Sequence, residues 1–401
     1  MKLESQQGSS DDDDDDDDDG QENIIEQASD CAPRWSSLPT DLLASHVVPK
    51  LSFIDFLHLK SVCKEWRDLS TTIRCTKAWP LLMTPSYARP GGSTEGGSFD
   101  VFDPVSKNKY TLSVQVPGAT VAQDGGNSSA LALHCSRNGW VLVSRGRSSF
   151  FLVNPFKRGA TVIILPPVRD VHLFKGISFC ATPGSADFTV MLIEGDDENT
   201  VSARTWREGQ DSWQQHADFE CEVPFPVAIH SPLFLDGEWY CVARDGKLAA
   251  FDPNTTTMVP WRLLDGLEPI VTNSFATGAE GMYVHLVEWK GEVVEEEPVE
   301  MFRLDRRSRM AWSKVEEPED GAVLLFWDRK QATARPSSSL AGEVGWNKVY
   351  EPAFTESEDG VWECVFYSLE TKEYSNCRCD LFGLREPLNA LWFQPNLDDF
   401  E

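Results

Sequence analysis

Apolar and polar positions follow two different patterns along this chain. Residues 34–75 carry apolar side chains at helical spacing, whereas short apolar runs separated by turn residues continue from about residue 98. The first pattern predicts three short helices and the second predicts β-strands. Residues 1–33 have no apolar periodicity and include an unbroken Asp run, Asp11–Asp19, so we expect a disordered acidic tail there.

Proline and serine positions divide the helical region. Pro39 suits the first turn of a helix, and Pro49 should end or distort that helix early. Ser52 is a plausible N-cap for a second helix around Phe53–His58. The third helix is predicted from residues that share one face of a 3.6-residue period: Leu59, Val62, Cys63, Trp66 and Leu69.

Two stretches of the strand region share one scheme. "GWVLVSRGRSSFFLVNPFKRGATVIIL" and "GEWYCVARDGKLAAFDPNTTTMVPWRL" each contain three strand patterns separated by turn residues. In both, the opening glycine lies 15 residues before the turn residue that precedes a proline, Asn154 or Asp252. The matching offset indicates an internal repeat. The predicted strands are Trp140–Val143, Ser149–Val153, Thr161–Leu165, Trp239–Ala243, Leu248–Phe251 and Met258–Leu263.

The repeat extends along most of the chain. Corresponding turns are predicted at positions 103, 154, 208, 252, 305 and 370, which are 51, 54, 44, 53 and 65 residues apart. Several strands in a unit of this length are typical of a β-propeller, because stacked units bury the faces that one unit leaves open. We therefore predict a mainly β fold with a small α domain, and a propeller of about six blades over residues 76–395. An acidic tail, 396–401, should follow.

Charge and cysteine usage narrow the function. The net charge of −28 disfavours nucleic acid and anionic membranes as main ligands. The start of the chain has no apolar leader, no stretch is long enough to span a membrane, and the ten cysteines form no CxxC pair. Cys377 and Cys379 lack a second ligand pair, so no metal is expected. We expect an intracellular protein, cytoplasmic and/or nuclear.

Few residues suggest catalysis. There is no H-E-x-x-H, G-x-S-x-G or P-loop motif, the seven histidines are dispersed, and no cofactor is expected. Asp103, Asn154 and Asp252 could be paired polar groups, but their shared place in turns favours capping of backbone N–H groups. A basic cluster is either a solvated turn or a contact for an acidic or phosphorylated peptide. Its members are Arg303, Arg306, Arg307 and Arg309.

Tryptophans of the strand region should lie mostly in the core, at positions 140, 206, 213, 239, 261, 312 and 362. The helical region, by contrast, carries more apolar surface than about 40 residues can bury. That surplus either packs on the propeller or forms a partner interface.

The helical region resembles an F-box. The resemblance lies in "WSSLPTDLL", in "LSFID" and in "VCKEWR", which together follow the L-P-x-D-L-L to V-C-x-x-W-R pattern of that family. This chain has one residue more than usual between Asp41 and Leu51, in the stretch that contains His46 and Pro49. The apolar mid-helix position of the family is therefore either Val47 or Val48.

Residues 76–395 resemble the C-terminal region of plant F-box proteins. That region is called domain of unknown function 295 or a KIB-type, kelch-like β-propeller. The similar pieces are "FLVNPFKRGATVIILPP", "FDPNTTTMVPWRLL" and "VLLFWDRKQATA" followed by "GWNKVYEP".

Together the resemblances imply a non-catalytic substrate-recognition subunit of an SCF ubiquitin ligase. The F-box would dock a Skp1-like adaptor, and through it a cullin, while the propeller would bind a protein substrate for ubiquitination. Leu38 and Pro39 are expected to be direct contacts, and Trp66 a packing residue. The residues that would build or fill the Skp1-like interface are Leu38, Pro39, Leu42, Leu43, Val47, Leu51, Val62, Cys63 and Trp66.

Two other functions stay open. The extra residue near Pro49 would suit an F-box-derived scaffold without a ligase role. A propeller enzyme that acts on a small molecule in the central channel is the other alternative, and it would need clustered histidines or carboxylates there.

Overall fold

A computed structural model describes the following parts of the chain: residues 38–72, 80–86, 97–103, 108–116, 131–146, 148–157, 161–169, 174–195, 200–216, 218–220, 231–243, 247–255, 260–264, 274–278, 281–286, 300–305, 311–314, 323–327, 332–336, 348–354, 362–368, 370–371, 373–380 and 390–396. The chain divides into two compact units, Met1–Cys75 and Thr76–Glu401. The predicted tail 1–33, and all of the predicted tail 396–401 except Asn396, lie outside the described residues. No helix in the described ranges is long and apolar enough to cross a membrane.

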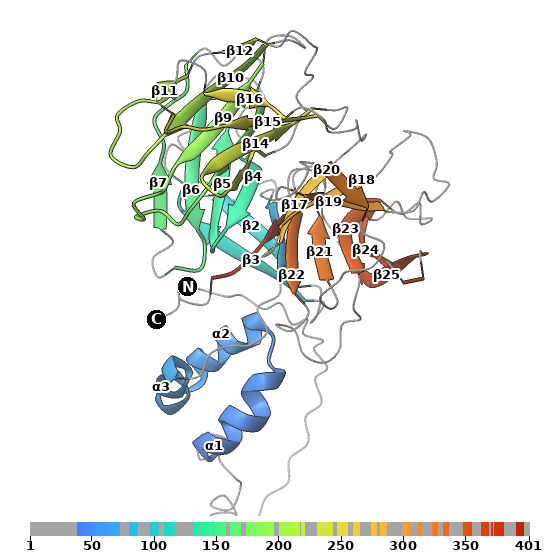
Figure 1. The fold of residues 1–401 in the computed structure, drawn as a ribbon. Helices are drawn as coiled ribbons and strands as arrows, with labels where there is room; N and C mark the ends of the chain where they lie inside the picture. Colours follow the sequence, from blue (N-terminus) through green and yellow to red (C-terminus); the bar gives the residue numbers. More distant parts are fainter. Residues whose placement is uncertain are drawn as a thin grey trace, which may run out of the picture. The chain divides into compact units, whose positions relative to one another are not determined.

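The first unit is helical (Figure 1). Its first helical segment takes three forms in succession: α1 (Thr40–Leu42), the π-helical turn η2 (Leu43–Val47) and the 3₁₀ turn η3 (Val48–Lys50). It is followed by α2 (Phe53–Val62) and α3 (Lys64–Thr72).

The prediction of the helix boundaries is confirmed at two places and wrong at a third. Pro49 lies in the last, 3₁₀ turn of the first segment, and Ser52 caps α2. A single third helix from Leu59 to Leu69 is wrong, because Cys63 has extended backbone angles, φ −154° and ψ 173°, and separates α2 from α3. Hydrophobic spacing does not reveal this break, because apolar residues continue at helical intervals on both sides of Cys63.

The second unit is built of mainly antiparallel sheets (Figure 1). The described strands form five sheets. The first has the order β26 (Leu391–Phe393), β1 (Leu81–Pro85), β2 (Gly97–Asp103) and β3 (Asn108–Val114). The second runs β4 (Leu131–Arg137), β5 (Trp140–Arg145), β6 (Ser149–Asn154) and β7 (Thr161–Ile164).

The next two sheets repeat this plan. One runs β11 (Gln214–Gln215), β10 (Thr200–Trp206), β9 (Val190–Glu194) and β8 (Phe174–Phe179), with β12 (Phe219–Glu220) also paired to β10. The other runs β13 (Leu233–Leu235), β14 (Glu238–Val242), β15 (Leu248–Phe251) and β16 (Trp261–Leu263).

The fifth sheet has nine strands. It begins with the meander β20 (Ala311–Lys314), β19 (Glu300–Asp305), β18 (Gly281–Leu286) and β17 (Ser274–Gly278). It continues through β22 (Ala332–Pro336), β21 (Val323–Trp327), β23 (Lys348–Phe354), β24 (Trp362–Ser368) and β25 (Glu373–Asp380). Parallel pairing of β17 with β22 joins the two halves.

The predicted repeat is visible in the hairpins. Each of the six predicted turn positions is the last residue of a strand or follows one within two residues, and that strand pairs with the next one at the end of a sheet. These pairs are β2–β3, β6–β7, β10–β11, β15–β16, β19–β20 and β24–β25. The sequence therefore placed all six turns correctly, although the last two units share one sheet.

The core of the described strands lies between neighbouring sheets. On β9, Val190 and Leu192 pack into a cluster with Trp140 and Leu152 of the second sheet. The alternate residues of β9 pack into a second cluster with Trp239 and Phe251 of the fourth sheet. Both faces of the strand are buried, as stacking of successive sheets requires. The prediction of core tryptophans is confirmed at Trp140, Trp206, Trp239 and Trp261. Trp213 is half-buried, and the side chains of Trp312 and Trp362 lie outside the described set.

The two ends of the second unit pair with each other. Strand β26, near the C-terminus, is antiparallel to β1, with Leu81 opposite Phe393 and Leu82 opposite Trp392. Trp392 and Phe393 are at most 1% exposed. This pairing brings the two ends of the unit into one sheet, as expected for the predicted propeller, which leaves few open strand edges.

Candidate functional site

The helical unit has a small core of its own. The apolar residues at most 5% exposed are Leu43, Val48, Phe53, Ile54, Phe56 and Leu59. They come from η2, η3 and α2, so the first helical segment and α2 supply most of the buried apolar surface. With so few buried side chains, a unit of this size is expected to gain stability from further burial by a partner.

The N-terminus of α2 is capped by a reciprocal pair. The hydroxyl of Ser52 accepts a hydrogen bond from the backbone N–H of Asp55 at 3.2 Å and donates to the Asp55 carboxylate at 2.8 Å. The N-cap therefore satisfies one of the free N–H groups of the first turn, and the Asp55 charge lies at the positive end of the helix. Both effects stabilise the start of α2 at Ser52, just after the first helical segment ends.

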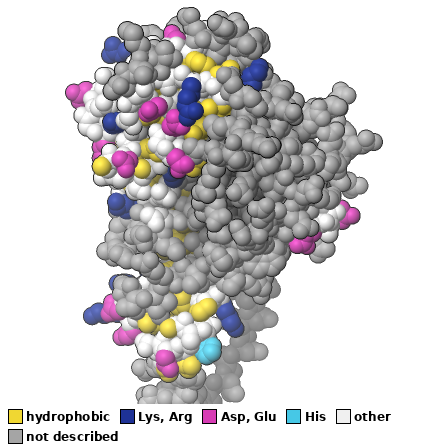
Figure 2. All heavy atoms as spheres, in the orientation of Figure 1, with side chains coloured by type: hydrophobic (Ala, Val, Ile, Leu, Met, Phe, Trp, Pro, Cys, Tyr) yellow, Lys and Arg dark blue, Asp and Glu magenta, His cyan; other side chains and the backbone are white. Residues whose placement is uncertain are grey.

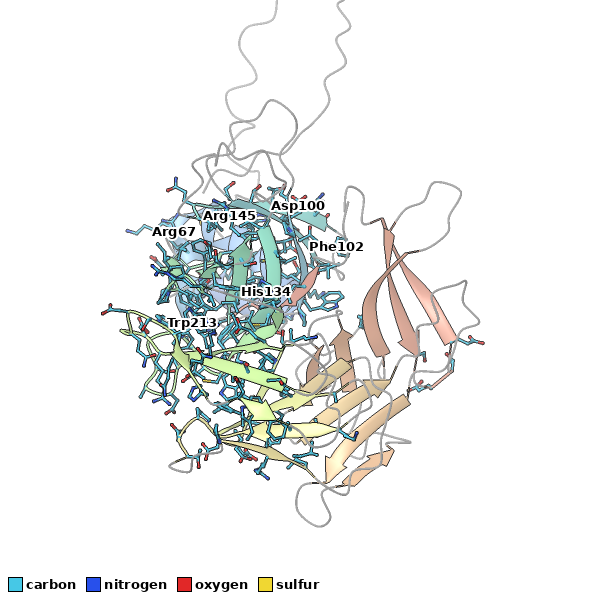
Figure 3. All side chains as sticks on the ribbon, turned by 90° about the horizontal axis from the view of Figure 1, so that it is seen from above. Arg67, Asp100, Phe102, His134, Arg145 and Trp213 are labelled. Carbon is cyan, nitrogen blue, oxygen red and sulfur yellow. The ribbon has the colours of Figure 1, made fainter. Side chains whose placement is uncertain are left out.

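The V-C-x-x-W-R motif joins α2 to α3. The sulfur of Cys63 accepts a hydrogen bond from the backbone N–H of Trp66 at 3.5 Å, which caps the start of α3. The Nε of Arg67, labelled in Figure 3, donates to the carbonyl of Lys60 at 3.1 Å, which satisfies a free carbonyl near the end of α2. The Arg67 side chain thus links α3 to the end of α2, and Trp66, the residue before it, is half-buried.

Charge also favours this junction. The pKa of Glu65, in the first turn of α3, lies below its usual value. The main cause is a hydrogen bond from its own backbone N–H to the carboxylate, and the second is a hydrogen bond with the Cys63 side chain. A carboxylate at this position also interacts favourably with the helix N-terminus.

Apolar side chains remain on the surface of the helical unit. Leu42 is 42% exposed and Val62 is 56% exposed, and these are two of the three large hydrophobic side chains that are exposed in the described part of the chain. Pro39 is exposed, and Leu38, Val47 and Leu51 are half-buried. Figure 2 shows yellow hydrophobic side chains gathered on the visible face of this unit, flanked by charged ones. We call Leu38, Pro39, Leu42, Val47 and Val62 the apolar surface of the unit.

The structure sorts the nine predicted interface residues into three groups. Five form the apolar surface, and Leu51, Cys63 and Trp66 are half-buried next to helix ends. Leu43 is fully buried, so it can support an interface only from beneath. Sequence reasoning missed the connecting role of Arg67, although its place one residue after Trp66 in the motif was visible.

Candidate sites in the second unit have structural roles. The Oδ1 of Asn154 accepts from the backbone N–H groups of Phe156 and Lys157, and the Oδ1 of Asp252 accepts from that of Asn254. The capping prediction is confirmed at both residues. Asp103 is buried, but residues 104–107 that follow it lie outside the described set. Of the basic cluster, Arg306, Arg307 and Arg309 lie outside it too, as does the side chain of Arg303.

Two histidines form cross-strand pairs with hydroxyls. His134 of β4, labelled in Figure 3, pairs with Ser144 of β5 at 2.8 Å, and its ring contacts Phe150 and Phe174. His216 pairs with Thr205 of β10, also at 2.8 Å. Among the described residues, no group of three or more His, Cys, Asp or Glu side chains could hold a metal ion.

The geometry therefore defines a class of protein: a small helical unit with exposed apolar side chains, followed in the chain by a β-propeller. Comparison with known families agrees. Residues 35–77 match the F-box domain family, and residues 101–368 match the family described as the KIB1-4 beta-propeller. The chain belongs to the KIB1-4 β-propeller family and carries an F-box before the propeller.

Its relatives include plant F-box proteins. An F-box/kelch-repeat protein of Arabidopsis thaliana is 27% identical over 375 residues, which cover 92% of this chain and 96% of that protein. A second F-box/kelch-repeat protein of the same plant is 29% identical over 57% of this chain and 56% of its own length. An Arabidopsis F-box protein is 23% identical over 90% of this chain and 89% of its own length.

Proposed function

We propose that this protein is the substrate-recognition subunit of an SCF ubiquitin ligase. The observation that supports this best is the apolar surface of the F-box unit, where Pro39 and Leu42 of the L-P-x-D-L-L motif are exposed although they are apolar. A partner that covers Leu42 and Val62 would remove apolar surface from water, which favours binding by about 25 cal/mol for each Å² before the entropic cost of association is subtracted. A Skp1-like adaptor is the partner that an F-box implies.

In this role the protein needs no reacting group of its own. The F-box would hold the chain on the adaptor and, through it, on a cullin, while the propeller would hold a protein substrate. The tether raises the local concentration of substrate at the ubiquitin-loaded enzyme, so that a bimolecular transfer becomes nearly intramolecular. The protein would act in the cytoplasm, the nucleus or both.

Co-purification from plant cells tests the proposal. The wild-type chain should recover a Skp1-like adaptor and a cullin, and the double variant Leu38→Ala plus Pro39→Ala should lose both. A matched control is Ile164→Ala, because Ile164 of β7 is 57% exposed but belongs to the propeller unit. A wild-type chain that folds yet recovers no adaptor would favour the scaffold function without a ligase role.

The substrate requires a second comparison. Proximity labelling with the proteasome inhibited should mark the same substrate with the wild type and with the double variant, because the propeller is unchanged. Without the inhibitor, that substrate should accumulate only in cells that express the double variant. Equal substrate levels in the two cell lines would argue against a degradative ligase role.

A further inference from the structure

Buried and exposed residues of the first helical segment are paired at steps of five. Leu43 and Val48 are 0% and 3% exposed, so both lie in the core of the F-box unit. The residues one position earlier are more accessible: Leu42 is 42% exposed, and Val47 is half-buried. An α-helix would align residues four apart, so this pattern needs another kind of turn.

The π-helical turn η2 supplies it. The backbone N–H of Val48 bonds to the carbonyl of Leu43, five residues earlier, whereas an α-helical bond spans four. One extra residue is therefore accommodated within the turn, and the residues after it keep the orientation that they would have in a shorter α-helix. The inward line then joins Leu43 to Val48, and the outward line joins Leu42 to Val47.

Continuous α-helix would give a different surface. Four residues after Leu42 comes His46, and four residues after Leu43 comes Val47. A polar imidazole would then interrupt the outward line, and Val47 would turn toward the core. The π turn thus places Val48 in the core and leaves Val47 half-buried, next to the exposed His46.

The local sequence favours this turn. Pro49 has no backbone N–H, so the carbonyl of Ser45 could not receive an α-helical bond from it. The hydroxyl of Ser45 donates to the carbonyl of Asp41 at 2.6 Å, which satisfies an acceptor where the α-helical turn changes into the π turn. The segment then closes in the 3₁₀ turn Val48–Lys50, where Leu51 N–H bonds to the Val48 carbonyl at 3.1 Å.

We infer that Val47, together with Leu42, contacts the Skp1-like adaptor, and that the π turn selects Val47 over Val48 for this contact. The inference rests on the proposed adaptor function. The sequence alone did not decide whether Val47 or Val48 is the mid-helix contact, and the π turn assigns it to Val47. The inserted residue is then compatible with adaptor binding. Val48 is then a core residue of the F-box unit.

Two matched valine variants test the assignment in the full-length chain. Binding to a purified Skp1-like adaptor would be measured by isothermal titration, and stability by thermal unfolding. Val47→Ala should weaken the affinity roughly tenfold with little change in the melting temperature, as expected for a central contact residue. Val48→Ala should lower the melting temperature of the F-box unit and leave the affinity of the folded protein within about twofold.

A deletion variant tests the π turn itself. Removing Ser45 makes Val47 the fourth residue after Leu42, so a regular α-helix would present the same two lines. The affinity of this variant should stay within about threefold of wild type. Loss of binding in a folded Ser45 deletion variant would contradict the inference that Leu42 and Val47 form one contact line and Leu43 and Val48 the buried line.

The outcomes separate the inference from the proposed function. If the wild type does not bind the adaptor, the proposed function fails. If the wild type binds, Leu38→Ala plus Pro39→Ala abolishes binding and Val47→Ala has no effect, only the inference fails. Weak binding by folded Val48→Ala with unchanged binding by Val47→Ala would reverse the assignment. Should Val48→Ala prevent folding, Val47→Ala alone decides.

Discussion

Asn154 organises the turn after β6 from a fully buried position. Its side-chain oxygen accepts two backbone hydrogen bonds, at 3.2 Å from Phe156 and 3.0 Å from Lys157. Asn154→Ala leaves these N–H groups without an acceptor and should lower the free energy of unfolding of the propeller by about 1–3 kcal/mol. Urea denaturation followed by tryptophan fluorescence would measure it.

The matched control is Asn254→Ala in the equivalent turn of another sheet. Asn254 is exposed. Its side-chain oxygen accepts a hydrogen bond from the Arg207 guanidinium at 2.9 Å. Its substitution should change the unfolding free energy by less than about 0.5 kcal/mol. Equal effects of the two substitutions would contradict a special role for the buried turn residue.

His216 should make the propeller sensitive to mild acid. Burial, and then the charge of Arg207, hold the pKa of His216 below its ordinary value of 6.5. The unfolded chain therefore takes up a proton as the pH falls below about 6.5 while the folded chain resists it, so stability is present above that pH and is lost below it. Because the ring is only partly buried, the loss at pH 5.5 should be under about 1 kcal/mol.

Comparison with His216→Gln isolates this effect. Glutamine can still hydrogen-bond to Thr205 but does not titrate, so carboxylates and other histidines contribute equally to both proteins. Wild type should lose more stability than the variant between pH 7.5 and pH 5.5. Parallel pH profiles would exclude His216 as a source of acid sensitivity.

Turn residues were the most predictable individual positions. Asn154 and Asp252 were assigned to turn capping because Asx side chains accept from the backbone N–H groups that follow them. A different hairpin signal was overlooked. Asn138 and Gly139 have φ of 49° and 80°, and Asp236 and Gly237 have 50° and 89°, so both pairs form the turns that favour Asn-Gly and Asp-Gly.

At the scale of elements, the start of α2 controls the F-box unit. Ser52→Ala removes the N-cap that accepts from the Asp55 N–H and should destabilise the helix by about 1 kcal/mol. Hydrogen exchange of the Asp55 and Phe56 amides should accelerate about fivefold as a result.

Ser61→Ala is a suitable control in the same helix. Ser61 is exposed, and its hydroxyl lies 3.5 Å from the Leu57 carbonyl, a weak contact. Exchange at the start of α2 should then be unchanged. Similar acceleration in both variants would show that the cap contributes no more than an ordinary surface serine.

Helix type was harder to predict than helix position. The sequence indicated helices and their proline limits, but the π turn follows from an inserted residue whose accommodation depends on packing of Leu43 and Val48 in the core. The boundary at Cys63 depends on the hydrogen bond from the Trp66 N–H to the Cys63 sulfur, which periodicity does not reveal. The exposed positions Leu42 and Val62 were foreseen as interface residues only through the motif.

At the scale of the whole molecule, closure by β26 should be essential for the propeller unit. A chain that ends at Ala390 lacks Trp392 and Phe393, both at most 1% exposed, and leaves β1 paired only with β2. Loss of one such aromatic side chain typically costs about 3–5 kcal/mol, so the truncated unit should unfold in much less urea. A chain that ends at Asn396 keeps β26 and should unfold like wild type; equal stability of both truncations would disprove closure.

The repeat was predictable because its turn residues recur at similar intervals. Pairing between repeats was not, because it depends on which strand edges meet in space. The parallel contacts of β17 with β22 and of β21 with β23 merge two predicted units into one nine-stranded sheet. In the sequence, β9 is a continuous apolar run, which does not by itself show that both faces of the strand are buried.

The central claim is that the apolar surface of the F-box unit docks a Skp1-like adaptor. The most direct measurement is titration of a purified Skp1-like adaptor into the full-length chain. We predict a 1:1 complex for wild type and for Ile164→Ala, and no complex for the folded double variant Leu38→Ala plus Pro39→Ala. A folded wild-type chain that does not bind, or a double variant that binds as tightly as wild type, would contradict it.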